Sequence, residues 1–317
     1  VLNVLQVATL GANQATIQFL KKYKLVMIHS LQLIWNPSEG ISIGSFTLRF
    51  YSLMFVIAFS LGYLITKKIY ERENRTQDEL DKLFLYTFIG ILLGARLGHV
   101  FFYDWDYYKN HLLEILLPFR FSPEFEFTGF AGLASHGAAI AVIIVMYYYS
   151  KKIVHKPVLW TLDRITLAVT IGGVFVRFGN FFNSEIYGHI MDKTSIFGVK
   201  FIREDEFWQA NNLHEITQIA NRNQAFDAIQ TDPRFSAVLD AIPFRHPTQI
   251  YEAAGYLVLF MVLTFLYWKT DARNYLGKLF GIFLVFLWVI RFAVEYVKES
   301  QGGFENALGM LSTGQWL

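Results

Sequence analysis

Charged and polar side chains stand at the ends of the long apolar segments of this sequence. A charged group at membrane depth costs several kcal/mol unless it is paired or hydrated, so such residues are candidates for function. They are Arg49, Tyr51, Arg96, His99, Ser135, His136, Arg177, Asn180, Asn183, Arg245, His246, Gln249, Tyr251, Glu252, Arg291 and Glu295.

Arginine exceeds acid within this set, which predicts an anionic ligand. Glu252 and Glu295 neutralise only part of the charge. A planar guanidinium suits a phosphodiester better than a lysine ammonium does. Pro247 fits the first position of a helix, where free backbone N–H groups attract phosphate. A phospholipid headgroup is the anion that we expect at this depth.

Two of the candidates have simpler alternative interpretations. Arg291 and Glu295 are four residues apart, so we interpret them as a structural ion pair on one helix face. His136 lies between Ser135 and Gly137, and a lone histidine is often a hydrogen-bonded structural group. The nearby arginines favour a role as a proton acceptor at neutral pH.

Six apolar segments are long enough to position these residues as membrane-spanning helices, which need about 20 residues each. They cover 46–66, 83–103, 130–150, 159–182, 248–268 and 276–298. Residues 312–317 resemble the start of a seventh span that is cut short. The predicted fold class is all-α, a polytopic membrane helical bundle.

The distribution of basic residues predicts the orientation of the bundle. Lys and Arg concentrate in the loops after the first, third and fifth spans, which are therefore cytoplasmic. The polar ends then gather toward the extracytoplasmic leaflet of the membrane. Residues 183–247 lie on that side and form a small extracytoplasmic subdomain, because the segment is long and its charge is mixed.

Composition supports a membrane protein. Hydrophobic residues make up 54% of 317 and charged residues 17%, and the mean hydropathy is +0.33. Cysteine is absent, so any thiol chemistry uses a thiol of the substrate.

We interpret residues 1–26 as an extension without function, or as an amphipathic helix on the membrane. Residues 27–317 form one predicted domain. We expect no metal, no cofactor and no nucleic-acid partner.

One short pattern occurs twice in the sequence, and another matches a hydrolase motif by chance. Arg96-Leu97-Gly98 and Arg177-Phe178-Gly179 each end a predicted span. The arginine meets the negative end of the helix dipole, and the glycine admits a neighbouring helix or a headgroup. The run 40–44 matches the Gly-x-Ser-x-Gly hydrolase pattern but lacks a strand–turn–helix setting, so we reject it.

At these residues the chain resembles the bacterial prolipoprotein diacylglyceryl transferases. The strongest match is Arg177-Phe178-Gly179-Asn180-Phe181-Phe182-Asn183-Ser184-Glu185, followed by Ile186-Tyr187-Gly188. Six further motifs occur in family order: 48–53, 94–98, 135–137, 245–252, 291–295 and 312–315. Val176, Ser52 and Ala138 stand where the family usually has glycine.

The resemblance implies transfer of a diacylglyceryl group from phosphatidylglycerol to the lipobox cysteine of prolipoproteins in the bacterial cytoplasmic (inner) membrane. The partners implied are phosphatidylglycerol, prolipoprotein lipobox peptides and membrane lipids. It implies His136 as the base, with Arg177 and Arg245 stabilising the leaving phosphate. The residues implied for lipid binding are Arg177, Arg245, Tyr51, Asn180, Gly188, Glu185, Arg96 and Arg291.

Two alternatives remain open on sequence. A transporter or non-enzymatic lipid-binding protein could also use clustered arginines, although transporters usually place their site at the midplane between repeated halves. An inactive relative that binds the lipid without transfer is the other alternative. Retention of His136, Arg177 and Arg245 argues against it.

Overall fold

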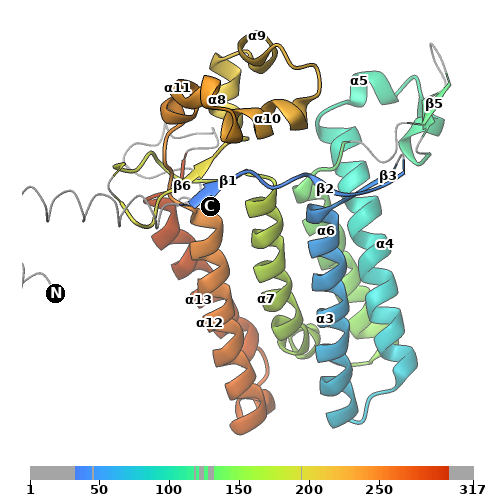
Figure 1. Cartoon of the computed structure of the whole chain (residues 1–317). Helices are drawn as coiled ribbons and strands as arrows, with labels where there is room; N and C mark the ends of the chain where they lie inside the picture. Colours follow the sequence, from blue (N-terminus) through green and yellow to red (C-terminus); the bar gives the residue numbers. More distant parts are fainter. Residues whose placement is uncertain are drawn as a thin grey trace, which may run out of the picture. The chain divides into compact units, whose positions relative to one another are not determined.

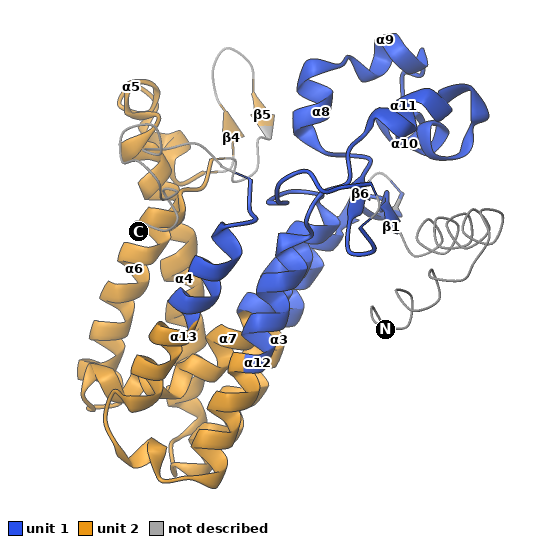
Figure 2. Cartoon of the chain, turned by 90° about the vertical axis from the view of Figure 1, so that its left-hand side faces the viewer, with its two compact units in different colours: residues 1–58, 173–258, 287–317 blue, residues 59–172, 259–286 orange. Residues whose placement is uncertain are grey.

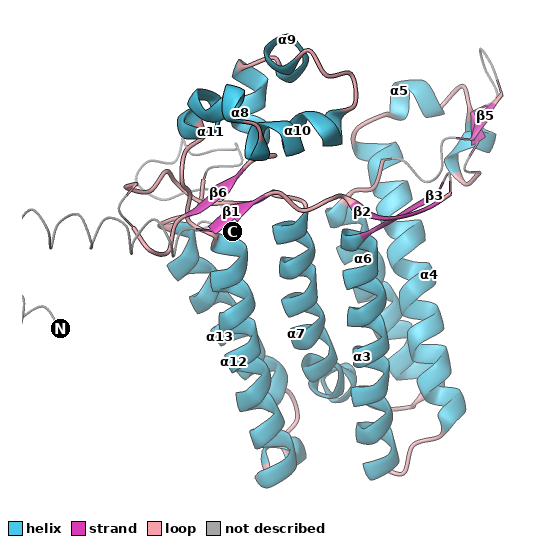
Figure 3. Ribbon diagram, in the orientation of Figure 1, coloured by secondary structure: helices cyan, strands magenta, loops and turns pink. Residues whose placement is uncertain are grey.

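The computed structural model describes residues 33–44, 46–117, 119–120, 125–127, 132–193 and 195–299 (Figure 1). The predicted extension 1–26 and the predicted start of a seventh span, 312–317, lie outside these residues. Helices predominate, as the sequence predicts, and three two-stranded sheets add short β-structure to the expected all-α fold (Figure 3).

The chain divides into two compact units, each described separately (Figure 2). Unit 1 comprises Val1–Ala58, Gly173–Val258 and Leu287–Leu317, and unit 2 comprises Phe59–Gly172 and Leu259–Phe286. Every boundary between the two falls inside a long helix.

Four helices are long and apolar enough to cross a membrane, among the residues that the structure describes. They are α3 (Phe50–Arg72), α4 (Gln77–Phe102), α7 (Val158–Phe182) and α12 (Thr248–Lys269). Helix α3 begins later than predicted because 46–49 belong to a strand. Helix α4 begins earlier because Thr76 and Glu79 form a capping box, which satisfies free N–H groups at its start.

Two more helices coincide with predicted spans without meeting the same standard of length and apolarity. Helix α6 (Ser135–Tyr148) has 14 residues and continues into the π-helix η2 (Tyr149–Ile153). Helix α13 (Lys278–Glu295) has 18 residues and includes Lys278, Arg291 and Glu295. The structure therefore supports four of the six predicted spans by length and composition.

The long helices expose large apolar side chains on their outer faces. Val56 of α3, Ile143 of α6 and Phe265 of α12 are 60%, 70% and 60% exposed. Water-soluble proteins rarely expose contiguous apolar surface on this scale. These faces are therefore suited to lipid, and the chain is a membrane protein.

Outside its helix ends, unit 1 contains short strands and a small helical cluster. Strand β1 (Leu33–Trp35) pairs in parallel with β6 (Val199–Phe201), and β2 (Gly40–Ile43) forms a hairpin with β3 (Phe46–Arg49). Ser42 of the rejected hydrolase pattern lies on this exposed hairpin, with Thr47 Oγ1 3.4 Å from its Oγ. A strand hairpin is not the setting of a nucleophilic serine.

The helical cluster lies within the segment 183–247. It comprises α8 (Asp205–Ala210), α9 (Leu213–Thr217), α10 (Arg222–Thr231), η3 (Pro233–Phe235) and α11 (Ser236–Ala241). Asn212, Asn221 and Asp232 cap successive helices through their side chains. The buried core consists of Ile202, Leu213, Ala225, Phe226, Ile229 and Ile242. This cluster thus has an apolar core of its own.

Helices α4 and α6 pack closely in unit 2. A Cβ at Gly98 would lie 2.7 Å from Gly137 Cα, and one at Gly137 would lie 2.2 Å from Gly94 O. Such backbone contact requires glycine on both helices. The remaining elements of unit 2 are α5 (Trp105–Tyr108), η1 (Leu112–Ile115), β4 (Phe119–Arg120), β5 (Glu126–Phe127) and η4 (Ala272–Asn274).

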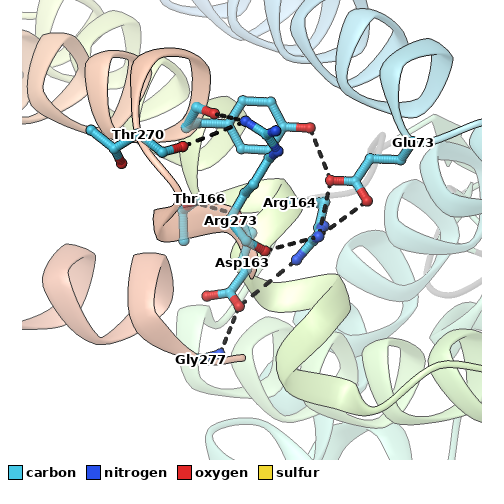
Figure 4. Close-up of polar contacts among 8 residues, drawn as sticks. Glu73, Asp163, Arg164, Thr166, Thr270, Arg273 and Gly277 are labelled. Atoms are coloured by element: carbon cyan, nitrogen blue, oxygen red, sulfur yellow. Dashed lines mark hydrogen bonds and ion pairs between the residues drawn. The ribbon is translucent and has the colours of Figure 1, made fainter. Parts of the chain in front are cut away.

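A buried ionic cluster joins the helix ends of unit 2 (Figure 4). Arg164 Nη2 donates to Glu73 Oε1 at 2.9 Å and to the Arg273 carbonyl at 3.2 Å. Asp163 accepts hydrogen bonds from the backbone N–H groups of Gly277 and Phe280 at 2.6 and 2.8 Å. Asp163 and Arg164 therefore hold α7 to the loop after α3 and to the start of α13.

Candidate functional site

Arg177 begins a polar cluster on the last turns of α7 in unit 1. Its Nε contacts the carboxylate of Glu252 on α12, and its Nη1 donates to Asn180 Oδ1 at 3.1 Å. Tyr256 Oη donates to the same Glu252 at 3.2 Å. The side chain of Arg177 is 14% exposed and that of Glu252 only 3%. Glu252 therefore orients Arg177 and offsets its charge in a largely buried place.

Glu185 extends this cluster beyond the end of α7. Its Oε1 accepts a hydrogen bond from Asn180 Nδ2 at 2.7 Å, and its backbone carbonyl accepts one from Gln249 Nε2 at 2.6 Å. Ser184 and Ile186 on either side have φ values of 55° and 58°. This left-handed conformation is unfavourable for residues other than glycine, so the surrounding contacts hold the loop against its local preference.

Tyr51 at the start of α3 completes the cluster. A Cβ at Gly179 would lie 2.9 Å from Tyr51 Cδ2, so the absent side chain makes room for the ring. The phenol interacts electrostatically with Glu185 and Arg177. The close approach predicted for the Arg-x-Gly pattern is thus confirmed at Gly179. Tyr51, Arg177, Asn180 and Glu185 are brought together as one group.

Arg245 lies in a second ionic group of unit 1, just before α12. Three carboxylates surround its guanidinium: Glu204 at Nε, Glu206 at Nη2 (2.7 Å) and Glu299 at Nη1 (3.3 Å). The guanidinium also lies 4.7 Å above the ring of Tyr187. Arg245 is therefore over-compensated by acid, whereas Arg177 contacts one carboxylate.

The three acids around Arg245 differ in exposure. The side chain of Glu204 is fully buried, whereas those of Glu206 and Glu299 are 56% and 34% exposed. Burial raises the pKa of the Glu204 carboxyl to about 7, against the opposing effect of Arg245. Glu204 is therefore the enclosed partner of Arg245, and Glu206 and Glu299 are the partners that solvent reaches.

Gly188 and Arg291 are the remaining predicted residues of unit 1. A Cβ at Gly188 would lie 2.1 Å from Val297 O and 2.7 Å from His246 Cβ, so glycine lets three chain segments meet. Arg291 lies 5.5 Å from the ring of Trp288, and Glu295 pairs instead with Lys298 at 3.6 Å. The interpretation of Arg291 and Glu295 as an ion pair is therefore wrong.

His136 and Arg96 belong to unit 2. His136 Nε2 lies 2.9 Å from Tyr103 Oη, and its side chain is exposed at the start of α6. Arg96 is buried and donates to the backbone carbonyls of Ile115 at 2.8 Å and Glu114 at 2.6 Å. Arg96 thus holds η1 against α4, and His136 keeps an accessible imidazole.

A pocket of about 560 Å³ adjoins the Arg177 cluster through Glu185. It is lined by Ser184, Glu185, Ile186, Tyr187, Asp205, Glu206, Gln209 and Glu299. Sequence reasoning identified Glu185 of this pocket as a site residue, and Ser184 and Tyr187 lie in the same motif. Glu206 and Glu299 gave no signal, because they are 39 and 54 residues from Arg245 and follow no motif or helical period with it.

The chain matches the model of a known protein family. The family model for prolipoprotein diacylglyceryl transferase matches residues 39–317. The chain belongs to the prolipoprotein diacylglyceryl transferase family. The resemblance predicted from the motifs is confirmed, and membership of this family makes the chain a transferase.

Curated members of the prolipoprotein diacylglyceryl transferase family are similar over nearly their whole length. Phosphatidylglycerol–prolipoprotein diacylglyceryl transferases of Bacteroides fragilis, Tolumonas auensis and Chloroherpeton thalassium are each 34% identical to this chain. The alignments cover 90%, 90% and 91% of this chain and 90%, 92% and 90% of the relatives, in that order.

Proposed function

We propose that this chain transfers the diacylglyceryl group of phosphatidylglycerol to the lipobox cysteine thiol of prolipoproteins. The products are a thioether-linked prolipoprotein and glycerol phosphate. Membership of the family and the names of the relatives support this assignment. The structural observation that carries it is the grouping of Tyr51, Arg177, Asn180 and Glu185 at one end of α7.

The reaction forms one bond and breaks one. The thiolate sulfur attacks the glyceryl carbon that bears the phosphate, and the C–O bond breaks toward oxygen. Glycerol phosphate leaves with the electron pair and gains negative charge. Arg177 stabilises this charge, because its guanidinium is partly accessible and is oriented by Glu252. Only interactions that strengthen as the charge develops accelerate the step.

His136 is the proposed base that removes the thiol proton. Its imidazole is exposed and hydrogen-bonded to Tyr103, so it can accept a proton in one tautomer while Tyr103 orients the ring.

Arg245 is the second proposed phosphate ligand. Glu206 and Glu299 are the more exposed members of its carboxylate group.

Three of the other proposed lipid-site residues are linked to Arg177. Asn180 accepts a hydrogen bond from Arg177, Glu185 accepts one from Asn180, and Tyr51 packs against Gly179. Gly188 and Arg291 are the further proposed lipid-site residues of unit 1, and Arg96 is the one proposed for unit 2.

The proposed setting is a bacterial cytoplasmic membrane crossed six times by one domain, residues 27–317. The active site faces the extracytoplasmic leaflet. The excess of Lys and Arg in alternate loops supports this orientation. The acceptor is a lipobox peptide that meets the lipid at this leaflet.

The test is a transfer assay with purified protein in phosphatidylglycerol micelles and a lipobox peptide, followed by mass spectrometry. The wild type adds a diacylglyceryl mass to the peptide, and Arg177→Ala lowers kcat/KM by about a hundredfold or more, the range for loss of one charge-stabilising donor. A peptide with Ser in place of Cys gains no mass.

Arg234→Ala is the matched control, because Arg234 is 79% exposed and pairs locally with Asp232. It retains wild-type transfer. If the wild type adds no diacylglyceryl mass while phosphatidylglycerol remains bound, the protein binds or transports the lipid without transferring it.

A further inference from the structure

The pocket beside Glu185 is strongly acidic. Four of its lining residues are carboxylates: Glu185, Asp205, Glu206 and Glu299. Arg245 contacts Glu206 and Glu299 and is shared with buried Glu204. Arg222 lies 3.9 Å from Asp205, and His189 Nδ1 lies 3.0 Å from Glu299, so these side chains offset part of the charge as well. The local charge remains negative, so the pocket favours a cation and opposes the phosphate of a lipid.

An uncompensated polar atom lies in the same pocket. Ser184 is 3% exposed, lines the pocket, and its Oγ has no hydrogen-bond partner in the described part of the chain. A buried hydroxyl without a partner costs about 1–3 kcal/mol. A ligand that donates a hydrogen bond to this oxygen would remove that cost. This observation is independent of the acidic charge.

These features define the chemistry of the ligand. The four carboxylates accept hydrogen bonds, and the Ser184 hydroxyl can accept one as well as donate one, so a cation rich in donors satisfies all of them. A lysine ammonium offers three donors and an arginine guanidinium five. Among the described residues no three His, Asp or Glu side chains are arranged to hold a metal ion. An organic cation is therefore favoured over a metal.

The exposure of the pocket identifies the source of this cation. The side chains of Asp205 and Glu206 at its rim are 76% and 56% exposed and lie outside the membrane-spanning helices. A water-borne polypeptide reaches this rim directly. Glu185 joins the pocket to the Arg177 cluster, so a polypeptide seated here lies next to the proposed lipid site.

We propose that this pocket binds a lysine or arginine side chain of the acceptor polypeptide and thereby selects basic acceptors. The inference rests on the proposed function, which requires a polypeptide substrate beside the lipid. The anionic lipid occupies the arginine side, and the basic side chain of the acceptor occupies the carboxylate side. The two substrates are separated by charge.

The test uses Gln209, a neutral exposed residue of the pocket lining. Acceptor peptides carry Lys, Gln or Glu at successive positions after the cysteine, and kcat/KM is measured for the wild type, Gln209→Glu and Gln209→Lys. The wild type prefers the best Lys peptide over its Gln counterpart by about fivefold, the value of a favourable partly exposed ion pair. Gln209→Glu increases this ratio, and Gln209→Lys reduces it to one or reverses it.

Binding measurements keep the inference separate from catalysis. The same peptides, with Ser in place of Cys and a fluorophore, are titrated against the three proteins in phosphatidylglycerol micelles. The Kd values follow the same order, and the preference weakens with salt. Equal Kd values for Lys and Gln peptides overturn the inference even if transfer proceeds. Absence of transfer with an intact Lys preference overturns the proposed function instead.

A lipid ammonium is the competing occupant. Micelles containing phosphatidylethanolamine distinguish it from a peptide side chain. If this lipid binds more tightly to Gln209→Glu than to Gln209→Lys while peptide charge has no effect, the pocket binds a lipid headgroup, and the inference is overturned.

Discussion

Arg177 and Arg245 show how the surroundings of one residue type divide its roles. Among the described residues, Arg177 contacts one carboxylate, that of Glu252, and its side chain is 14% exposed. Arg245 is 2% exposed and is surrounded by three carboxylates. A developing phosphate charge is therefore stabilised first at Arg177. Arg245 also fixes the segments that bear Glu204, Glu206 and Glu299.

Glu204 provides a pH-dependent stability that can be measured. Its folded pKa of about 7 lies above its ordinary value of 4.5, so the folded state binds the proton more strongly than the unfolded state. The free energy of unfolding therefore falls as pH rises from 4.5 to about 7. We expect the apparent Tm of the wild type to fall through this window relative to that of Glu204→Gln.

Thermal unfolding in detergent across this pH range checks the expectation for Glu204. Glu215→Gln, an exposed substitution on α9, removes the same charge and should follow the wild-type profile. If the apparent Tm of the wild type and of Glu204→Gln changes with pH in the same way, Glu204 has the same pKa in the folded and unfolded states, and the expectation is wrong.

At the scale of elements, the α4–α6 pair depends on glycine at the contact. A Cβ at Gly137 would lie 2.2 Å from Gly94 O and 2.6 Å from Gly98 Cα, and both are backbone atoms that cannot turn aside. We expect Gly137→Ala to separate the helices and to destabilise the protein by about 1–3 kcal/mol, the usual cost of overpacking. A fall in apparent Tm in detergent would register this loss.

Gly281→Ala is the matched control on α13. Nothing lies within 4 Å of the Cβ that it adds, and alanine favours a helix by about 1 kcal/mol over glycine. Its apparent Tm should equal or exceed that of the wild type. An equal fall in both variants would mean that glycine flexibility, and not close packing, is required.

At the scale of the whole molecule, buried charges hold several helix ends of unit 2 together. Arg164 is 4% exposed and binds Glu73 and the Arg273 carbonyl, while Asp163 caps the start of α13. Removal of one partner from a buried ion pair costs about 3–5 kcal/mol, because the other charge stays buried alone. We expect Arg164→Ala to lower the apparent Tm strongly.

Arg120→Ala is the comparison for Arg164→Ala. Arg120 pairs with Glu126 at 3.6 Å, and both side chains are about half exposed or more. An exposed pair contributes about 1 kcal/mol at most, so its loss should leave the apparent Tm nearly unchanged. Similar losses for the two variants would contradict a structural role for the buried cluster.

The orientation of the chain in the membrane can be tested because the sequence has no cysteine. Gln209→Cys and Lys152→Cys each introduce a single exposed thiol, in α8 and after α6. The outer membrane is permeabilised and the cytoplasmic membrane is left intact. A maleimide that cannot cross the cytoplasmic membrane should then label Gln209→Cys, and it should label Lys152→Cys only after the cells are lysed. The reverse pattern would overturn the proposed orientation.

Length and hydropathy were enough to predict the positions of the long helices, and the motifs were enough to predict the family. A helix is the local way to satisfy every backbone hydrogen bond in an apolar segment of about 20 residues, so length and hydropathy suffice to locate it. All six predicted segments contain a helix, with ends shifted by local caps and strands such as Thr76 and 46–49. The motif residues Arg177, Asn180 and Glu185 are near neighbours in sequence, so their grouping could be predicted.

The partners of the buried arginines depend on tertiary packing and could not be predicted from the sequence. Arg177 pairs with Glu252, and Arg245 pairs with acids 41, 39 and 54 residues away. Helical spacing predicted a pair between Arg291 and Glu295, yet Glu295 contacts Lys298, three residues further along, so spacing leaves more than one local partner open. A buried charge pairs with the opposite charge that tertiary packing brings close to it, because the interaction is strong at short distance and low dielectric. The spacing of residues in the sequence does not specify which charge that is. The acidic pocket arises in the same way, from the loop after α7, helix α8 and Glu299.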